Sequence, residues 1–329
     1  MNHIGLLVTM LLAAPAVAAP SLLVVNQGDA SVSIVDPVSL AVVGTIAQGM
    51  AGKDHAHEAA VSADGQTAYL PVYGDSGLAR PGSDGRTILL ADLPSRRITG
   101  QIDLGRGLRP HMPMLSAKTG MLYVTTELDQ SVTIIDPGAR AVVGRIPTGS
   151  DGSHMLALSH DARLGYTVNY KPGTISVLDL QQRRLAATIP VAETLQRITI
   201  SADDKWLFTS DNSQPRLAVI DTASRTVRHW VALPGTGQGS AASQDGRWLL
   251  VTMPRVAQVA VIDLRTMAVA RTITTGKTPV SVLIQPDQTR AHVANAGDGT
   301  VSVIDMANWQ VIKTIATAPG ADGLAWASR

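Results

Sequence analysis

The chain has 329 residues, with 27 Lys and Arg against 26 Asp and Glu, and a formal net charge of +1 at pH 7. This balance provides no bulk attraction to nucleic acid or to an anionic membrane. Aromatic residues make up 3% of the chain, too few for a base-stacking platform. The absence of cysteine excludes disulfides, thiolate metal sites and cysteine nucleophiles.

The first 18 residues have the pattern of a secretory signal peptide. An apolar run over residues 4–12 leads into small residues that end in Ala16-Val17-Ala18, an A-x-A cleavage pattern. The run is too short for a stable membrane anchor, and no later segment has the apolar length of a transmembrane helix. The sequence predicts a periplasmic or secreted protein of residues 19–329, and an uncleaved N-terminal helix is the alternative.

A repeat of about 42 residues runs through the rest of the chain. Seven alternating apolar segments each end in an aspartate, at Asp36, Asp92, Asp136, Asp179, Asp221, Asp263 and Asp305. The first spacing is 56 residues and the others lie between 42 and 44. Such regularity predicts one repeat domain rather than two separate domains.

Each repeat divides into four short strands separated by polar or glycine-containing turns. In the unit around Asp179 the predicted strands are residues 154–159, 165–170, 174–180 and 185–191. Four strands in 40–45 residues is the size of a propeller blade. The sequence therefore predicts an all-β, seven-bladed β-propeller with four antiparallel strands per blade, and an open solenoid is the alternative.

The two ends of the chain supply parts of one blade. Residues 22–47 match the second, third and fourth strands of a repeat, with no first strand before them. A segment that matches a first strand appears at residues 324–328. We expect this C-terminal strand to complete the N-terminal blade and close the ring, which argues against a solenoid.

Segments that join a second to a third strand resemble those of a known family. They read YVTTELDQSVTIID, YTVNYKPGTISVLD, HVANAGDGTVSVID and LVVNQGDASVSIVD, and they are similar to the YVTN-type, WD40-like β-propeller repeat. The resemblance covers essentially residues 19–329 and implies a bacterial extracytoplasmic protein. Related propellers include haem d1-binding, nitrous-oxide-reductase-like and lactonase-type proteins, so the resemblance implies a fold without fixing a chemistry.

One position breaks the repeat. In every repeat one residue opens the turn that follows the first strand. The position five residues before it is occupied, in chain order, by His57, His111, His154, Gln196, Gln238, Val280 and Gly323. Because first strands are the innermost strands, these side chains are expected to meet at one mouth of the central channel. Three imidazoles there could share a divalent ion, contact a polar small molecule, or line a water-filled rim without function.

Other candidate residues lie close to this register. His55 forms an H-x-H pair with the first histidine and is a further candidate metal ligand if both lie on a strand; otherwise it is a loop residue. Glu58 is either a general base or metal-ligand partner or a solvated strand residue. Arg197 could bind a ligand carboxylate, and Tyr73 and Glu127 are candidate ligand contacts in turns of the same face.

The extra length of the second blade falls at residues 74–86, between its second and third strands. On the face where the chain enters the first strands, such an insertion is expected to be a lid or specificity loop. A tolerated surface insertion is the alternative, because long loops cost little entropy.

The sequence lacks a nucleophile elbow, a P-loop and a dinucleotide fingerprint. It favours a monomeric, non-catalytic protein that binds a small molecule or another extracytoplasmic protein at the channel mouth, with no nucleic acid partner. One alternative is a lactonase-like, metal-assisted hydrolase or lyase in which the three histidines hold a divalent ion that activates water. Another is a haem- or copper-associated redox accessory protein, so whether the protein is an enzyme stays open.

Overall fold

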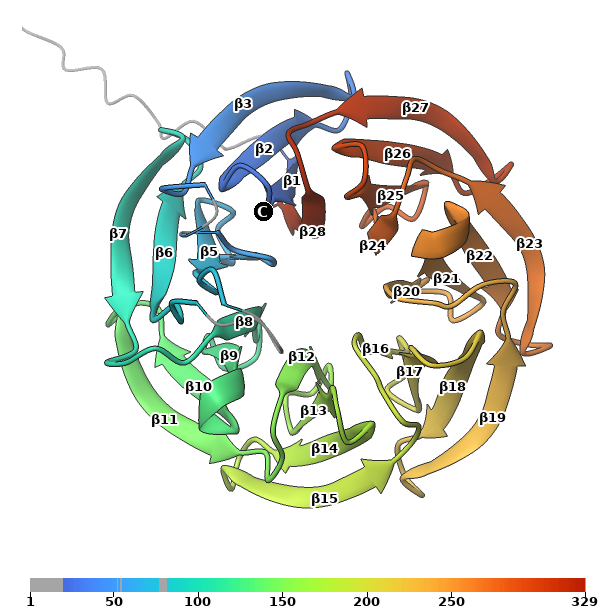
Figure 1. The fold of residues 1–329 in the computed structure, drawn as a ribbon, viewed down its shortest axis with the longest axis horizontal. Helices are drawn as coiled ribbons and strands as arrows, with labels where there is room; N and C mark the ends of the chain where they lie inside the picture. Colours follow the sequence, from blue (N-terminus) through green and yellow to red (C-terminus); the bar gives the residue numbers. More distant parts are fainter. Residues whose placement is uncertain (1–19, 52, 54, 77–81, 329) are drawn as a thin grey trace, which may run out of the picture.

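The computed structural model describes residues 20–51, 53, 55–76 and 82–328. Seven four-stranded antiparallel sheets form a closed ring around a central channel (Figure 1), so the predicted seven-bladed propeller is confirmed. The predicted signal peptide, residues 1–18, lies outside the described residues. No helix in the described part of the chain has the length and hydropathy of a membrane span.

The strands have, in chain order, these bounds: β1 Ser21–Asn26, β2 Ser31–Asp36, β3 Ala41–Ala47, β4 Ala60–Val61, β5 Thr67–Pro71, β6 Thr87–Asp92, β7 Arg97–Asp103, β8 Pro110–Leu115, β9 Leu122–Thr126, β10 Ser131–Asp136, β11 Ala141–Pro147, β12 Ser153–Leu158, β13 Leu164–Asn169, β14 Thr174–Asp179, β15 Arg184–Pro190, β16 Thr199–Ile200, β17 Trp206–Asp211, β18 Arg216–Asp221, β19 Thr226–Ala232, β20 Ser240–Ala242, β21 Trp248–Met253, β22 Gln258–Asp263, β23 Ala268–Thr274, β24 Pro279–Ile284, β25 Arg290–Asn295, β26 Thr300–Asp305, β27 Gln310–Ala316 and β28 Ala321–Ala327. Two 3₁₀ helices, η1 Glu127–Asp129 and η2 Pro254–Val256, each follow a second strand.

Six blades consist of four consecutive strands, with the first strand beside the channel and the fourth at the rim (Figure 1). The remaining blade has the order β28-β1-β2-β3. In it β28 pairs antiparallel with β1, with Trp326 opposite Leu22 and Leu324 opposite Val24. The predicted closure of the ring is therefore confirmed, and β28 begins at Ala321, three residues earlier than the sequence suggested.

The apolar core lies between neighbouring blades. Leu22 and Val24 of β1 belong to the same buried cluster as Val301 and Val303 of β26, in the adjacent blade. Because the middle strands are covered on both faces, they are nearly continuous apolar runs, whereas the outer strands are exposed over much of their length. Each blade thus depends on both neighbours for the burial of its apolar faces.

The repeating aspartates at the ends of the third strands are turn residues. The Asp36 carboxylate accepts hydrogen bonds from the backbone N–H groups of Val38 and Ser39. Asp305 accepts the equivalent bonds from Ala307 and Asn308. This is the local hydrogen bonding that favours aspartate in tight turns, so the most regular feature of the sequence serves the fold and not a site.

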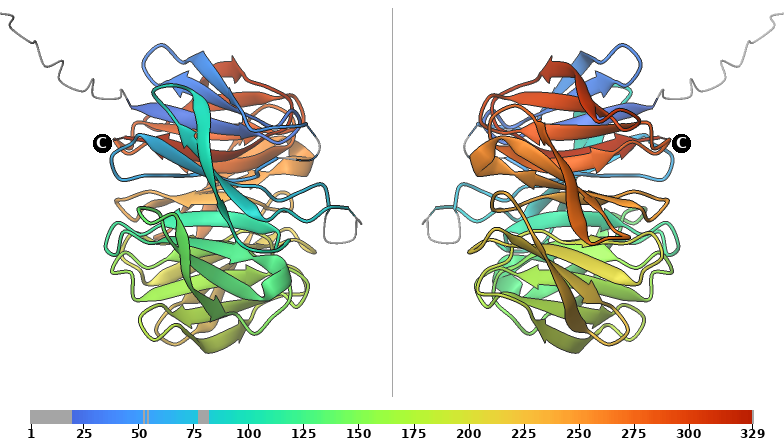
Figure 2. Two further views of the ribbon diagram at one scale, coloured as in Figure 1. Left: turned by 90° about the vertical axis from the view of Figure 1, so that its left-hand side faces the viewer. Right: turned by 90° about the vertical axis from the view of Figure 1, so that its right-hand side faces the viewer.

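The insertion of the second blade lies between Pro71 and Thr87. Its described ends project from one face of the ring (Figure 2), and they are joined by a bridge between Gly74 and Asp84. We call this the upper face. The opposite, lower face carries the turns that connect the first strand of each blade to its second strand.

Candidate functional site

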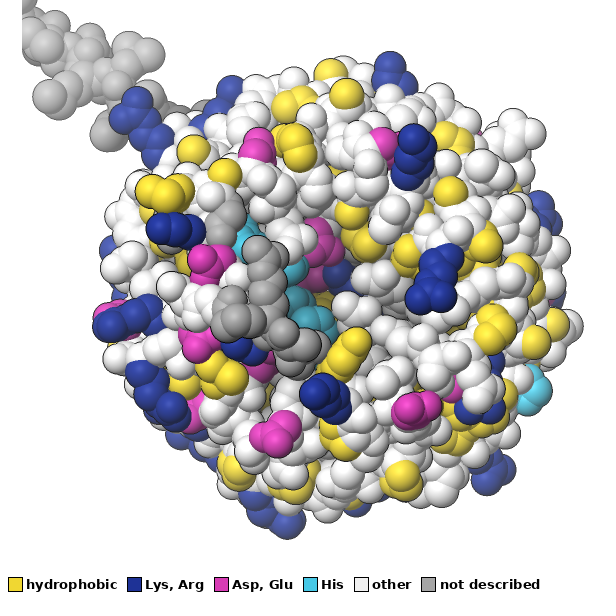
Figure 3. Space-filling model, viewed as in Figure 1, with side chains coloured by type: hydrophobic (Ala, Val, Ile, Leu, Met, Phe, Trp, Pro, Cys, Tyr) yellow, Lys and Arg dark blue, Asp and Glu magenta, His cyan; other side chains and the backbone are white. Residues whose placement is uncertain are grey.

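The three histidines of the register meet at the upper mouth of the channel, where histidine side chains gather in the central hollow (Figure 3). The ring centroids of His57 and His111 are 5.0 Å apart, and those of His111 and His154 are 3.9 Å apart. Tyr73 packs edge-on against the first two rings, at 5.0 and 5.4 Å. Equivalent repeat positions in consecutive blades thus place three imidazoles side by side.

The backbone around these histidines differs from blade to blade. His111 and His154 belong to β8 and β12, whereas His57 precedes the two-residue strand β4. The H-x-H pair therefore lies in a loop, yet the His55 and His57 ring centroids are still only 5.3 Å apart. Gln196 likewise precedes a two-residue strand, β16.

These side chains surround a pocket of about 490 Å³, a volume within the range of small-molecule sites. The predicted residues that line it are His55, His57, Tyr73, His111, His154, Gln196, Arg197 and Gln238. We call it the upper pocket. Glu58 and Glu127 are not among the described residues that line it; both carboxylates are buried behind it.

Buried carboxylates hold two of the imidazoles. His57 Nδ1 lies 2.9 Å from Asp322 Oδ2, and His154 Nδ1 lies 2.5 Å from Glu127 Oε1. A carboxylate oxygen accepts hydrogen bonds, so each imidazole is placed to donate from Nδ1, with Nε2 turned away from the carboxylate. Glu127 also accepts a 2.7 Å hydrogen bond from the Tyr73 hydroxyl. Burial and the neighbouring Glu127 charge raise the pKa of Tyr73, so this hydroxyl stays a donor.

The middle imidazole is buried and neutral. Burial lowers the pKa of His111 well below its usual value of 6.5, and His154, His57 and Arg197 lower it further. Its Nδ1 atom is buried without a hydrogen-bond partner among the described residues. A nitrogen lone pair therefore remains available on this ring at neutral pH.

Arg197 forms the floor of the upper pocket. Its Nη1 atom lies 2.6 Å from Glu58 Oε1, and its Nη2 atom lies 2.9 Å from Asp322 Oδ1. The three residues come from separate blades, so the guanidinium reaches across the channel. Arg197 thus binds two carboxylates of the protein itself. Glu58 is a buried partner of this cation, and its alternative assignment as a solvated residue is wrong.

Burial determines how the two carboxylates titrate. The pKa of Glu58 is raised, because desolvation outweighs the attraction of Arg197. Burial acts on Asp322 in the same direction, but the hydrogen bond from His57 and the charge of Arg197 outweigh it and lower the pKa of Asp322. Of the two carboxylates, Glu58 is therefore the one that takes up a proton first as the pH falls.

The insertion is tied to the pocket by polar contacts. Arg109 Nε donates to Asp84 Oδ1 at 2.7 Å and to Ser76 Oγ at 2.8 Å, and Ser76 Oγ donates to Asp84 Oδ1 at 2.6 Å. Asp75 and Ser76 line the upper pocket. The described ends of the insertion therefore form part of the pocket wall, while residues 77–81 lie outside the described residues.

The histidine rings of the register lie close together, and neighbouring rings are tilted by 33° and 32°. Among the residues that the structure describes, no three His, Asp or Glu side chains are arranged so that they could hold a metal ion. A metal at His57, His111 and His154, with His55 nearby, stays a prediction that requires the rings to turn.

Asp322 is a site residue that the sequence reasoning missed. It stands one position before Gly323, the register position of the closing strand, and links His57 to Arg197. A charged residue beside an otherwise apolar inner strand was the available signal. Gln27 was also missed; its Nε2 lies 3.4 Å from His57 Nε2.

Comparison with known proteins gives a partial family match. The family model described as "Cytochrome D1 heme domain" matches residues 117–240, and the predicted resemblance to haem d1-type propellers is confirmed over that segment. Similar solved structures include hydrazine synthase from Kuenenia stuttgartiensis, with a TM-score of 0.75 and 18% identity over 92% of this chain and 99% of that chain. Another is the dihydro-haem d1 dehydrogenase NirN in complex with DHE, with a TM-score of 0.64 and 15% identity over 92% and 73%. No curated protein matches the chain. At these identities the structural likeness shows the fold alone.

Proposed function

We propose that this protein is an extracytoplasmic binding protein that holds an iron tetrapyrrole of the haem d1 class in the upper pocket. The observation that carries the proposal is the pair of imidazoles, His57 and His154, whose Nδ1 atoms are fixed by buried carboxylates. A carboxylate that accepts a hydrogen bond from the other ring nitrogen orients a metal-ligating histidine and raises its basicity, and imidazole is a common ligand of haem iron.

The imidazole nitrogens and amide N–H groups of the pocket fit such a ligand. His57 is the more exposed of the two carboxylate-held imidazoles, with 17% of its side chain accessible against 11% for His154. Gln196 accepts a 3.1 Å hydrogen bond from Asn212 on its Oε1, which leaves its amide N–H groups to donate to ligand carboxylates. Gln27 and Gln238 line the same pocket. When bound, the iron would supply a Lewis-acid centre, and the residues of the chain would bind and orient it.

The family match supports the same ligand class. Residues 117–240 contain Glu127, His154 and Arg197, which contribute one carboxylate–imidazole pair and the floor. The other pair joins His57 of the second blade to Asp322 on β28 of the closing blade. A bound macrocycle would therefore contact both the matched segment and the closing blade.

Titration of the purified protein with haem d1 and with haemin tests this function. We expect a saturable change in the absorption spectrum of at least one tetrapyrrole, with His57→Gln or His154→Gln weakening binding by about tenfold or more. Glutamine removes the imidazole but can still donate to the carboxylate. His229→Gln, on the exposed strand β19, is the matched control and should bind as the unchanged protein does. Absence of any spectral change, or full binding by the His57→Gln/His154→Gln double variant, would refute the proposal.

A divalent-ion site for a hydrolase or lyase is the second candidate. It is favoured by the neutral His111 ring, with its unpartnered Nδ1, between two carboxylate-held imidazoles. Metal analysis of the purified protein and calorimetric titration with Zn²⁺ and Cu²⁺ test it. Metal binding that His111→Gln abolishes, together with no tetrapyrrole binding, would put this candidate in place of the first.

A further inference from the structure

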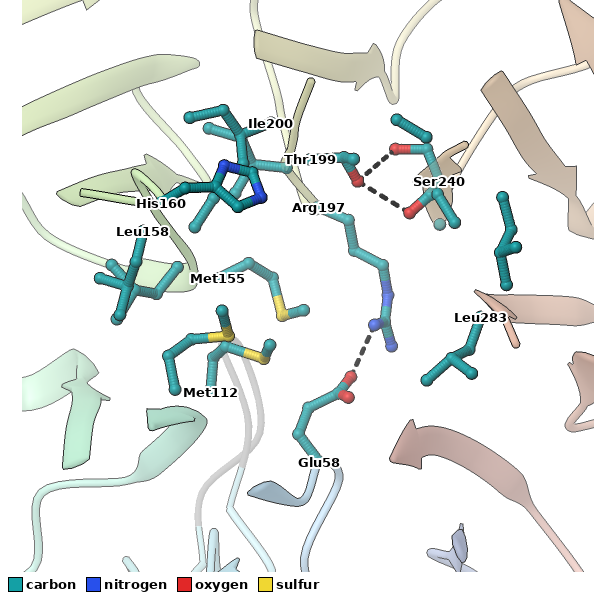
Figure 4. A pocket seen from close by; sticks show the side chains of 18 of the residues that line it. Glu58, Met112, Met155, Leu158, His160, Arg197, Thr199, Ile200, Ser240 and Leu283 are labelled. Atoms are coloured by element: carbon teal, nitrogen blue, oxygen red, sulfur yellow. Dashed lines mark hydrogen bonds and ion pairs between the residues drawn. The ribbon is translucent and has the colours of Figure 1, made fainter. Parts of the chain in front are cut away.

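A second cavity lies beneath the floor of the upper pocket. It has a volume of about 580 Å³, and Arg197 is the residue that lines both cavities. Figure 4 shows the Arg197 guanidinium reaching to Glu58, which also lines this cavity. We call it the lower cavity. It extends from Arg197 to the turns of the lower face, among them Ser159 and His160.

The walls of the lower cavity are mainly apolar. Met112, Met155, Ile200 and Leu283, from four different inner strands, surround the space (Figure 4). These side chains offer a hydrocarbon and thioether surface that adapts to apolar ligands of varied shape. Such a cavity with few polar groups is typical of small-molecule sites.

Two polar side chains of the wall, Thr199 and Ser240, satisfy each other. Thr199 Oγ1 donates to the backbone carbonyl of Ser240 at 2.7 Å, and Ser240 Oγ donates to Thr199 Oγ1 at 2.8 Å. These two hydroxyl groups are therefore already hydrogen-bonded within the wall. Arg197 is different, because a guanidinium has five N–H donors and its two ion pairs, to Glu58 and Asp322, engage Nη1 and Nη2. Its remaining N–H groups can donate to one ligand oxygen.

The charges around the cavity are compensated at both ends, which favours a neutral ligand. At the upper end, the Arg197 guanidinium is already paired with the carboxyl groups of Glu58 and Asp322. At the lower mouth, turn aspartates follow the serines that end the first strands: Ser159 Oγ donates to Asp161, Ser201 Oγ to Asp203, and Ser243 Oγ to Asp245. These hydrogen bonds lower the pKa of each carboxyl group, so all three are ionised at neutral pH. Each of these carboxylates has a cation beside it: Lys205 forms a 2.9 Å ion pair with Asp203, and the charges of Arg163 and Arg247 act on Asp161 and Asp245. The aspartates and these cations therefore offset one another.

We propose that the lower cavity is a second ligand site, for a compact, neutral, hydrocarbon-rich molecule with one carbonyl or hydroxyl oxygen that accepts a hydrogen bond from Arg197. The site is separate from the upper pocket, and its existence does not depend on tetrapyrrole binding. The apolar wall provides the affinity through burial of hydrocarbon surface. The hydrogen bond from Arg197, at the end of the cavity that meets the upper pocket, sets the orientation of the ligand.

Fluorescence titration with two probes tests the proposal. 6-Propionyl-2-dimethylaminonaphthalene is neutral and carries one ketone, whereas 1-anilinonaphthalene-8-sulfonate has a similar apolar body and a negative charge. We expect the neutral probe to bind with a blue-shifted emission, and the anionic probe to bind at least about tenfold more weakly. Equal or tighter binding of the anion would overturn the assigned ligand chemistry.

Variants locate the bound probe. Leu283→Trp should fill the cavity and weaken binding of the neutral probe by about tenfold or more. Ala241→Phe, at another lining position, provides the same test if the first variant does not fold. Val38→Trp, at a side chain that is 85% exposed, controls for the added indole. Binding that survives both cavity variants, or that falls with His57→Gln instead, would place the probe elsewhere and refute the proposal.

Discussion

Arg197→Met removes the cation that Glu58 and Asp322 share across the channel. Methionine preserves much of the apolar stem but leaves two carboxylates buried without their main partner, at positions that now lie 2.6 and 2.9 Å from guanidinium nitrogens. Breaking a buried ion pair by removing one partner costs about 3–5 kcal/mol. With an unfolding entropy of about 2.1 cal/mol/K per residue, this corresponds to a fall in Tm of roughly 6 °C.

The loss of stability caused by Arg197→Met should depend on pH, and the pKa of Glu58 determines the direction of that dependence. The pKa of Glu58 is already raised by burial, and loss of the Arg197 charge raises it further. A carboxyl group with a raised folded-state pKa contributes stability below its unfolded pKa, and this contribution is lost as the pH rises through the folded value. The deficit of Arg197→Met should therefore be largest at pH 7 and shrink toward pH 4.5, and adding Glu58→Gln should recover part of it.

Urea unfolding followed by circular dichroism at pH 7 and pH 4.5 measures these differences. Arg265→Met is the matched control, because Arg265 is 65% exposed in its ion pair with Asp263 and exposed pairs contribute about 1 kcal/mol or less. If the free energy of unfolding of Arg197→Met at pH 7 falls no further than that of the control, the floor of the upper pocket is not the buried ion network that the geometry describes.

Four further outcomes are expected. Deleting residues 321–329 removes β28 and exposes the edge of β1, so the truncated protein should aggregate or lose cooperative unfolding; a soluble protein with unchanged Tm would contradict the pairing. Gly323→Ala places a methyl group 2.3 Å from the His57 carbonyl oxygen, which should lower the free energy of unfolding by about 1–3 kcal/mol. It should also weaken binding in the upper pocket. Urea unfolding measures the first effect, and haem titration measures the second. Burial lowers the pKa of His292 to about 4, so its neutral form contributes about 3 kcal/mol above pH 6.5 that is lost as the pH falls toward 4; His292→Leu should flatten the decline in unfolding free energy over that range. Mass spectrometry of the exported protein should find an N-terminus at Ala19, and an intact Met1 would refute the predicted cleavage.

The sequence by itself determined the ring. The turn aspartates and serines recur because each blade needs the same tight turns, and the apolar runs recur because each middle strand is buried on both faces. Those local requirements repeat at a fixed spacing, so the blade number followed from the spacing, and closure by β28 followed from the match of the two chain ends to parts of one repeat. The same symmetry placed His57, His111 and His154 side by side, since equivalent positions of consecutive repeats must lie on one ring.

Only the tertiary structure decided which partners these side chains have. Asp322 reaches His57 because the last strand of the chain lies beside the second blade, and Arg197 reaches Glu58 because the channel is narrow enough for a guanidinium to cross. No spacing in the sequence encodes either distance, since each depends on how far a long side chain extends over the channel. The division of the channel into a histidine-lined upper pocket and an apolar lower cavity arises from that crossing, because one buried cation fills the space between them.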